Sequence, residues 1–448
     1  MNRAAGRTAP LCTSGFVVVV AAQMTCILPF PLPHIRLRDM AATRRRSNRA
    51  LVNDEKIRRA VIEEILDKGV DRLSLREVGQ RAGLTHGATY ARFEDVDEMI
   101  IDTWEAVLKS HVFASYQWCQ LASVDPVAAN VINLFDAMEQ ATDEFVAGLH
   151  VVLVSRRQGP LREVIDSFLD EHVRDFDPAT REYQPRDARA LTVFAVLAGR
   201  LLMLHHRLEE EELVKVGGQI VANIFTAAVD ESTMNEPVPL PVVLAPRQRD
   251  LVRIALSEAA FVVVGRSGVD HATFSRIARV AGCPTAHDIY SSKSQLIATA
   301  LRHDYIDPWM RLVNFVNILE PGYLAKMLHH ATVMDPDRRR FTLEVSLAIS
   351  YHPDIRTAAR EHMDELESIT TEIDDLSEDE RVLLRVLIRI MAYSMFAVTF
   401  IESLVRTSPW EDLFYIGESI RMGVISGHEE TWATLRTKLL RYYYSQIR

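Results

Sequence analysis

The chain has 448 residues, enough for more than one domain. Its 48 % hydrophobic and 25 % charged content is that of a soluble globular protein, and only 18 glycines and 18 prolines favour long helices. A net charge of −10 argues against a generic nucleic-acid coat protein, although it allows one small basic patch. The four cysteines form no CxxC pair, which excludes a zinc ribbon and suits a reducing cytoplasm; they are Cys12, Cys26, Cys119 and Cys283.

Residues 1–52 are expected to form a disordered extension that ends in a basic stretch. Within it, an apolar run over residues 16–22 follows two arginines, as in a secretory signal. Polar residues interrupt the run, three prolines close it, and it falls short of the roughly 20 apolar residues that span a bilayer. We therefore expect that an upstream start has been included and that Met40 is the native first residue.

Residues 53–102 predict a compact three-helix unit. Its first helix has one apolar face and ends at Gly69. Ser74 and Glu77 then form a capping box that opens a second helix, and Gly83 suits the positive φ of a helix C′ position.

A third helix is expected to begin after Thr85, which can cap it. Helix, glycine turn and helix within about twenty residues is the layout of a DNA-recognising helix-turn-helix. The alternative is some other helical hairpin, because any such hairpin needs the same cap, small residue and turn.

A basic stretch lies just before and inside the first helix of this unit. Beside a helix-turn-helix in an acidic chain, it favours an arm that follows phosphates or lies in a minor groove. The alternative is a solvated flexible tail. The stretch comprises Arg44, Arg45, Arg46, Arg49, Lys56, Arg58 and Arg59.

At these residues the chain resembles the tetracycline-repressor (TetR) family of bacterial transcription regulators. The resemblance covers residues 54–104 well and the later helices loosely. Two positions depart from the family, since His86 and Val96 stand where it usually has basic residues. The matching features are Ser74-Leu75-Arg76-Glu77-Val78, Ala82-Gly83-Leu84-Thr85, Gly87, Tyr90 and Phe93.

The resemblance implies that the helix from Thr85 enters the major groove of a double-stranded DNA operator, while Tyr90 touches phosphate. Together with the basic arm, the expected DNA-binding residues are Arg44, Arg45, Arg46, Ser74, Thr85, His86, Gly87, Thr89, Tyr90 and Arg92.

Residues 103–236 predict a helical ligand-binding and dimerisation domain. A long helix from Glu94 through Leu108 leads into it, and by resemblance the tilt of this helix transmits a ligand signal. The family pairs two terminal helices, here expected near residues 191–204 and 219–229, with those of a second subunit in a four-helix bundle. Four apolar residues at helical spacing are pocket candidates, with plain core as the alternative: Met138, Phe145, Phe194 and Met203.

Residues 237–246 predict a Pro-rich, extended linker, after which the pattern repeats. A constant offset over several positions is stronger support for a duplication than any single motif. We expect a second helix-turn-helix over residues 247–297 and a second helical body over 298–448. Pairs at an offset of 199 are Gly69 with Gly268, Ser74 with Thr273, and Gly83 with Gly282.

The second recognition helix is altered. The second copy has two residues fewer than the first between its turn glycine and its closing aromatic residue. This shortening rotates the residues that follow by about 200° around the helix axis. Asp288 would face anionic DNA, whereas Lys293 stands where the family has a phosphate-contacting Lys. We expect this copy to keep its fold but to recognise DNA weakly or not at all, with Thr273 and Lys293 as weak contacts.

Other chemistry finds no support in the sequence. The pairs His205-His206 and His329-His330 are adjacent residues, which point about 100° apart on a helix and do not chelate one ion. Residues 382–405 are apolar, but three charges within them favour a core helix over a membrane span. Because no catalytic or nucleotide-binding motif is present, we expect no metal, no cofactor and no enzymatic activity.

We therefore predict an all-α cytoplasmic protein made of two fused TetR-like units, with no membrane partner. The units pack as an intrachain pseudo-dimer on an asymmetric site, or two chains form a homodimer. By resemblance the protein is a transcriptional repressor that a small apolar effector releases from DNA. The alternative is a helical ligand-binding or protein-interaction module that has lost DNA binding.

Overall fold

In the computed structural model, the described residues form helices and one short hairpin, which confirms the predicted helical class. The description covers residues 48–127, 129–130, 142–157, 159–202, 211–227, 229, 234, 251–284, 286–304, 317, 320–326, 329, 336–405 and 410–447. The predicted arm residues Arg44, Arg45 and Arg46 and the linker 237–246 lie outside these ranges.

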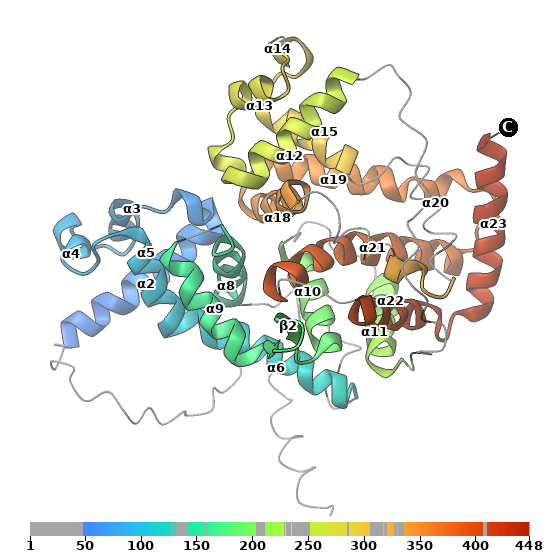
Figure 1. Cartoon of the computed structure of the whole chain (residues 1–448), viewed down its shortest axis with the longest axis horizontal. Coiled ribbons are helices and arrows are strands. Elements are labelled where there is room, and N and C mark those ends of the chain that lie inside the picture. The colour runs from blue at the N-terminus through green and yellow to red at the C-terminus, as the bar shows by residue number, and fades with distance from the viewer. Residues whose placement is uncertain are drawn as a thin grey trace, which may run out of the picture. The chain divides into compact units, whose positions relative to one another are not determined.

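The first half of the chain contains the predicted three-helix unit and a helical body (Figure 1). Its elements are α2 (Asn48–Lys68), η1 (Val70–Arg72), α3 (Leu75–Arg81), α4 (His86–Tyr90), α5 (Val96–Thr103), η2 (Trp104–Leu108), α6 (Lys109–Val124), α8 (Asp143–Val154), α9 (Pro160–His172), β1 (Arg174–Asp177), β2 (Glu182–Pro185), α10 (Ala188–Leu202) and α11 (Glu211–Thr226).

The second half is also helical, and no hairpin is found in its described residues. Its elements are α12 (Leu251–His271), α13 (Phe274–Val280), α14 (Ala286–Ile289), α15 (Lys293–Asp304), α18 (Pro336–Tyr351), α19 (Pro353–Glu367), α20 (Ile369–Glu372), α21 (Glu378–Val405), α22 (Trp410–Ile425) and α23 (Glu429–Ile447).

The two copies share their local backbone geometry, as the offset of 199 predicts. Gly69 and Gly268 end the first helices with φ of 80° and 76°. Ser74 and Thr273 each cap the next helix by accepting a backbone N–H at 3.2 Å. In both turns the glycine has positive φ, and the residue after it donates its N–H to the carbonyl five residues earlier, which closes a Schellman motif.

The predicted long helix after Glu94 is confirmed and continues to Val124. Its middle turn, η2, is a π-helical turn rather than an α-helical one. Trp104 and Leu108 at its two ends are fully buried, and the Trp104 ring meets Phe168 of α9 edge-on at 5.3 Å. This helix therefore joins the helix-turn-helix to the body through a tightly packed segment.

The hairpin of β1 and β2 corrects the expectation of helices throughout residues 103–236. Its strands are antiparallel, and Phe176 pairs with Tyr183 across them. Asp177 closes the turn by accepting bonds from the Ala179 N–H at 2.8 Å and the Thr180 hydroxyl at 3.0 Å. An Asp-Pro pair followed by small and polar residues favours such a turn, so the sequence did carry a signal for it.

The terminal helices of the two halves pack on each other within the single chain. Helix α10 packs against α21, and α11 packs against α22. The helices approach closely at two glycines. A Cβ added to Gly199 would lie 2.7 Å from the Phe396 ring, and one added to Gly423 would lie 2.4 Å from the Ile224 side chain. Small residues at these positions therefore let helices from opposite halves approach each other.

Helix α21 is the predicted core helix, and two of its arginines pair with the carboxylate of Glu367. Arg389 lies 2.5 Å from Glu367 of α19, and Arg385 lies 3.5 Å from the same residue. Across the described ranges, no helix combines the length and the apolar character needed to cross a bilayer.

A cluster of ionic groups joins the halves near the two helix-turn-helix units, and we call it the junction. Arg157, just after α8, contacts both carboxylate oxygens of Asp71 at 2.5 Å and pairs with Glu344 of α18. Arg72 donates to Asp270 at 2.9 Å. Burial opposes the charge of Arg157, but the two carboxylates outweigh it and raise the pKa of the guanidinium.

Two equivalent glycines fit under side chains of the opposite half at this junction. A Cβ on Gly69 would lie 2.6 Å from the Tyr351 ring, and one on Gly268 would lie 2.8 Å from the Arg157 guanidinium. Each glycine already needs positive φ to end its helix. The same residues thus serve both the local turn and the contact between halves.

Replacing Arg157 by Met should destabilise the protein by about 3 kcal/mol or more, because Glu344 and Asp71 would keep buried charges without a partner. The midpoint of urea unfolding measures this loss. Arg59→Met is the matched control, since Arg59 pairs with Glu63 at the surface and should cost less than about 1 kcal/mol. Equal losses in the two variants would show that the junction adds nothing to stability.

His150 should make stability depend on pH. It is 1 % exposed in α8, lies 3.0 Å from the Ser350 hydroxyl, and burial lowers its pKa from 6.5 to about 4. The unfolded chain therefore binds a proton that the folded chain does not, so this group reduces stability as pH falls from about 6.5 to about 4.

Between pH 7 and pH 5 the wild type should lose about 2 kcal/mol more unfolding free energy than His150→Gln, which cannot titrate. Urea unfolding at the two pH values measures the difference. Parallel losses in both proteins would mean that His150 protonates as easily in the folded state as in the unfolded chain.

Candidate nucleic-acid interface

The crossing of α3 and α4 depends on Gly79 and Thr89. Thr89 is fully buried, and a Cβ on Gly79 would lie 2.3 Å from its hydroxyl oxygen. Thr89 was expected to contact DNA, and its burial corrects that expectation. In a two-helix crossing this close, one side chain of the short helix must fill the space above the glycine, and Thr89 has that role.

The outer face of α4 is small, exposed and uncharged where its side chains are described. Thr85, Gly87 and Ala88 are exposed, and Tyr90 is 49 % exposed. His86 begins the helix, but its side chain lies outside the description. Tyr90 is at the surface, and its contact with phosphate stays a prediction.

The two predicted caps differ. Ser74 accepts the Glu77 N–H and also donates to the Glu77 carboxylate, both at 3.2 Å, so its hydroxyl is engaged inside the unit. Thr85 occupies the N-cap position of α4, but its side chain makes no cap bond. The capping role expected of the Thr85 hydroxyl is therefore wrong, and this exposed hydroxyl is a candidate for contact with a ligand.

Arg92 is held inside the unit rather than presented to a partner. Its guanidinium pairs with Asp54 at 2.8 Å and with Asp102 at 3.4 Å, and its side chain is only 26 % exposed. The expected role of Arg92 as a DNA contact is thus corrected to that of a strut between α2, α4 and α5. Arg81 is held in the same way by Glu64 and Asp67.

The first unit as a whole is acidic. Residues 48–103 hold nine basic and twelve acidic residues, a net charge of −3. Among cations with described side chains in this unit, Lys56 and Arg76 are exposed and have no ion pair. Strong binding to phosphates would therefore need charge from outside the unit.

In the second unit the recognition helix is short, as predicted. Helix α14 has four residues, and the His287 ring stacks on Phe274 at 4.0 Å. Thr273 caps α13. Lys293 donates to the Val269 carbonyl at 2.8 Å, and burial lowers its pKa, so its expected phosphate contact is corrected to a helix C-terminal cap on α12.

The predicted ligand pocket is closed core where it is described. Phe145 and Phe194 are buried with ring centroids 6.1 Å apart, and the void beside Phe194 measures about 10 Å³, room for roughly one water. Met138 and Met203 lie outside the description.

A larger hollow of about 600 Å³ lies between α11, α21 and the start of α23. Three separate segments of sequence meet there, so no single stretch could indicate it. Its polar and apolar lining includes Lys215, Gln219, Asp379, Val382, His428 and Thr431.

Compared with known proteins, the chain matches no family model, and no curated protein matches its sequence. Among the described residues, no three His, Cys, Asp or Glu side chains gather as a metal site would require.

The crossing predicts opposite effects at two glycines of the helix-turn-helix. Gly79→Ala should lower the unfolding free energy, because its Cβ meets buried Thr89, whereas Gly87→Ala has open space and should raise it by up to about 1 kcal/mol. Thr89→Ala added to Gly79→Ala removes the clash and should recover part of the loss. Urea unfolding of the four proteins tests this, and a neutral Gly79→Ala would refute the close crossing.

Proposed function

We propose that the chain is a DNA-binding transcriptional repressor of the TetR type, in which α4 recognises an operator. The observation that carries this proposal is the helix-turn-helix itself: α3 is capped, the Gly83 turn is closed, and α4 presents Tyr90 outward. The packing of α10 on α21 and of α11 on α22 supports a single chain that acts as its own dimer.

The proposed release step needs a small molecule that binds one conformation better than another. The hollow between α11, α21 and α23 is of a size that suits a small ligand. Its charged and polar lining favours an effector with polar groups over the purely apolar one expected from sequence. Because both halves line it, occupancy would change how the halves pack.

The second candidate is a helical ligand-binding or interaction module that no longer binds DNA. The net charge of −3 on the first unit and the neutral face of α4 favour it. Binding of the full chain to its own upstream DNA separates the two candidates, with unrelated DNA of equal length as the reference.

Tyr90→Ala should weaken specific DNA binding about tenfold, since a hydrogen bond to a charged phosphate contributes roughly 1.5 kcal/mol. Fluorescence anisotropy with labelled upstream DNA measures it. Tyr444→Ala removes another exposed tyrosine, from α23, and should leave binding unchanged. If the unmodified chain prefers no sequence at any salt concentration, the repressor proposal is wrong and the module candidate takes its place.

A further inference from the structure

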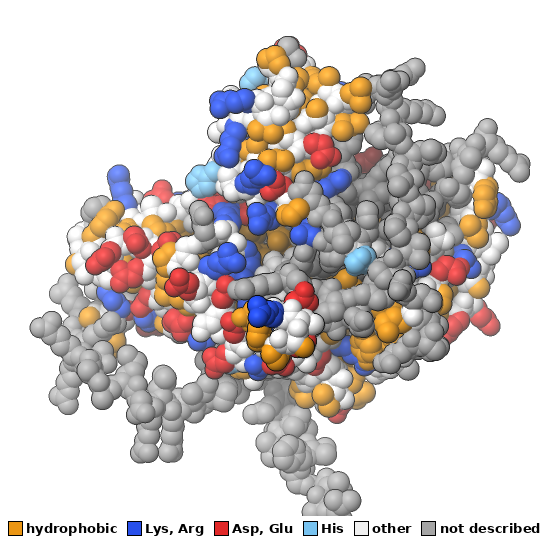
Figure 2. Space-filling view, viewed as in Figure 1, with side chains coloured by type: hydrophobic (Ala, Val, Ile, Leu, Met, Phe, Trp, Pro, Cys, Tyr) orange, Lys and Arg blue, Asp and Glu red, His pale blue; other side chains and the backbone are white. Residues whose placement is uncertain are grey.

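The two helix-turn-helix units carry opposite net charge. Residues 251–304, from α12 to α15, hold six basic and four acidic residues, a net charge of +2, against −3 for residues 48–103. The unit with the altered recognition helix is therefore the one that attracts an anionic polymer. Figure 2 shows basic side chains on the surface formed by α12 and α13.

The basic charge of the second unit is concentrated on α13. Arg276 and Arg279 are both exposed there, and no ion pair to either is found among the described residues. Residues three apart on a helix share one face, so the two guanidinium groups are neighbours. At the offset of 199, the first unit has Glu77 and Gln80 at these positions, so the charge is particular to the second copy.

The neighbouring α14 is poorly suited to read bases. It has only four residues, His287 is stacked on Phe274, and Asp288 is exposed on it. An exposed carboxylate repels phosphate, while two unpaired arginines on α13 suit contacts that do not depend on sequence. The surface therefore fits the DNA backbone better than it fits base edges.

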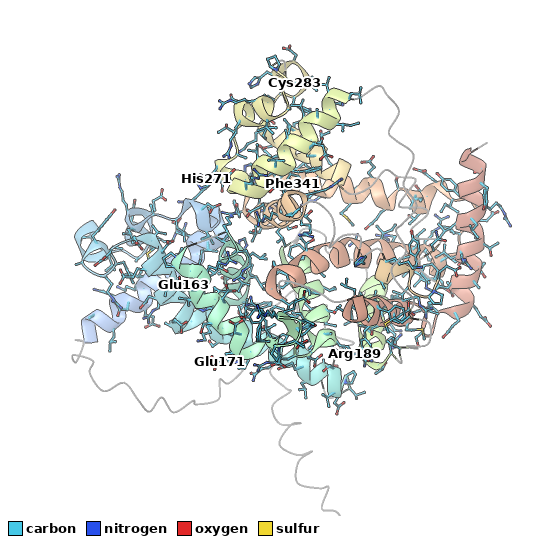
Figure 3. All side chains as sticks on the ribbon, in the orientation of Figure 1. Glu163, Glu171, Arg189, His271, Cys283 and Phe341 are labelled. Atoms are coloured by element: carbon cyan, nitrogen blue, oxygen red, sulfur yellow. The ribbon has the colours of Figure 1, made fainter. Side chains whose placement is uncertain are left out.

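The junction joins the segment just before α13 to the segment just before α3 of the first unit. Asp270 lies three residues before the cap Thr273 of α13, and its partner Arg72 lies two residues before the cap Ser74 of α3. In Figure 3, His271 marks the end of α12 at this junction, and Cys283 marks the turn after α13.

We propose that the second unit is a phosphate anchor, in which Arg276 and Arg279 bind the sugar-phosphate backbone of duplex DNA while α4 alone recognises sequence. This inference rests on the proposed function. It assigns unequal roles to the copies: one provides specificity and the other provides salt-dependent affinity.

The test is a salt series of DNA binding by the full chain, with upstream and unrelated DNA as probes. Each phosphate contact contributes about 0.9 to the slope of log K against log salt, so Arg276→Gln with Arg279→Gln should flatten the slope by about 1.8. The ratio of specific to unrelated binding should stay the same. Lysine at both positions keeps the charge and should keep the slope.

Arg360→Gln with Arg441→Gln is the matched control. These arginines are exposed on α19 and α23, have no ion pair in the described ranges, and change the net charge equally. The phosphate-anchor proposal is wrong if this control flattens the salt slope as much as the α13 variant does. It is also wrong if the α13 variant leaves the slope unchanged or alters sequence preference. In each of these cases the repressor proposal still stands. If the unmodified chain binds no DNA, both proposals fail.

Discussion

The buried ion pairs of Arg157 are the contact on which the arrangement of the two halves depends. This one guanidinium joins Asp71 beside the first helix-turn-helix to Glu344 in the body of the second half, and it covers Gly268 beside the second helix-turn-helix. Removal of charges from water costs several kcal/mol per ion, so such a cluster is retained only where its geometry is satisfied.

In the proposed single-chain pseudo-dimer, the two halves can differ because each is always beside the other. The first copy keeps a five-residue α4 with an exposed tyrosine, yet its arginines are paired internally and its net charge is negative. The second copy has two residues fewer between its turn glycine and its closing aromatic residue, and it carries exposed arginines on α13. In a homodimer both changes would appear in both subunits, whereas the proposed single-chain regulator can place sequence recognition and DNA affinity in different halves.

Much of the local structure follows from the sequence. The caps at Ser74 and Thr273, the positive φ at Gly83 and Gly282, and the offset of 199 were all predictable, since each is decided by residues within a few positions. The Asp177 hairpin was missed although its Asp-Pro turn was visible. Apolar periodicity on either side of it favoured helix, and short strands give a weak pattern.

The sequence by itself determined the helical class and the local caps and turns, because short-range spacing encodes caps, turns and apolar faces. Only the tertiary structure decided which candidate residues face outward. Thr89 is buried because Gly79 lies beneath it, Arg92 is paired because Asp54 lies 38 positions away in sequence but adjacent in space, and Arg157 meets a carboxylate 187 residues distant. Side-chain partners over such separations depend on how helices pack, and no local pattern records that.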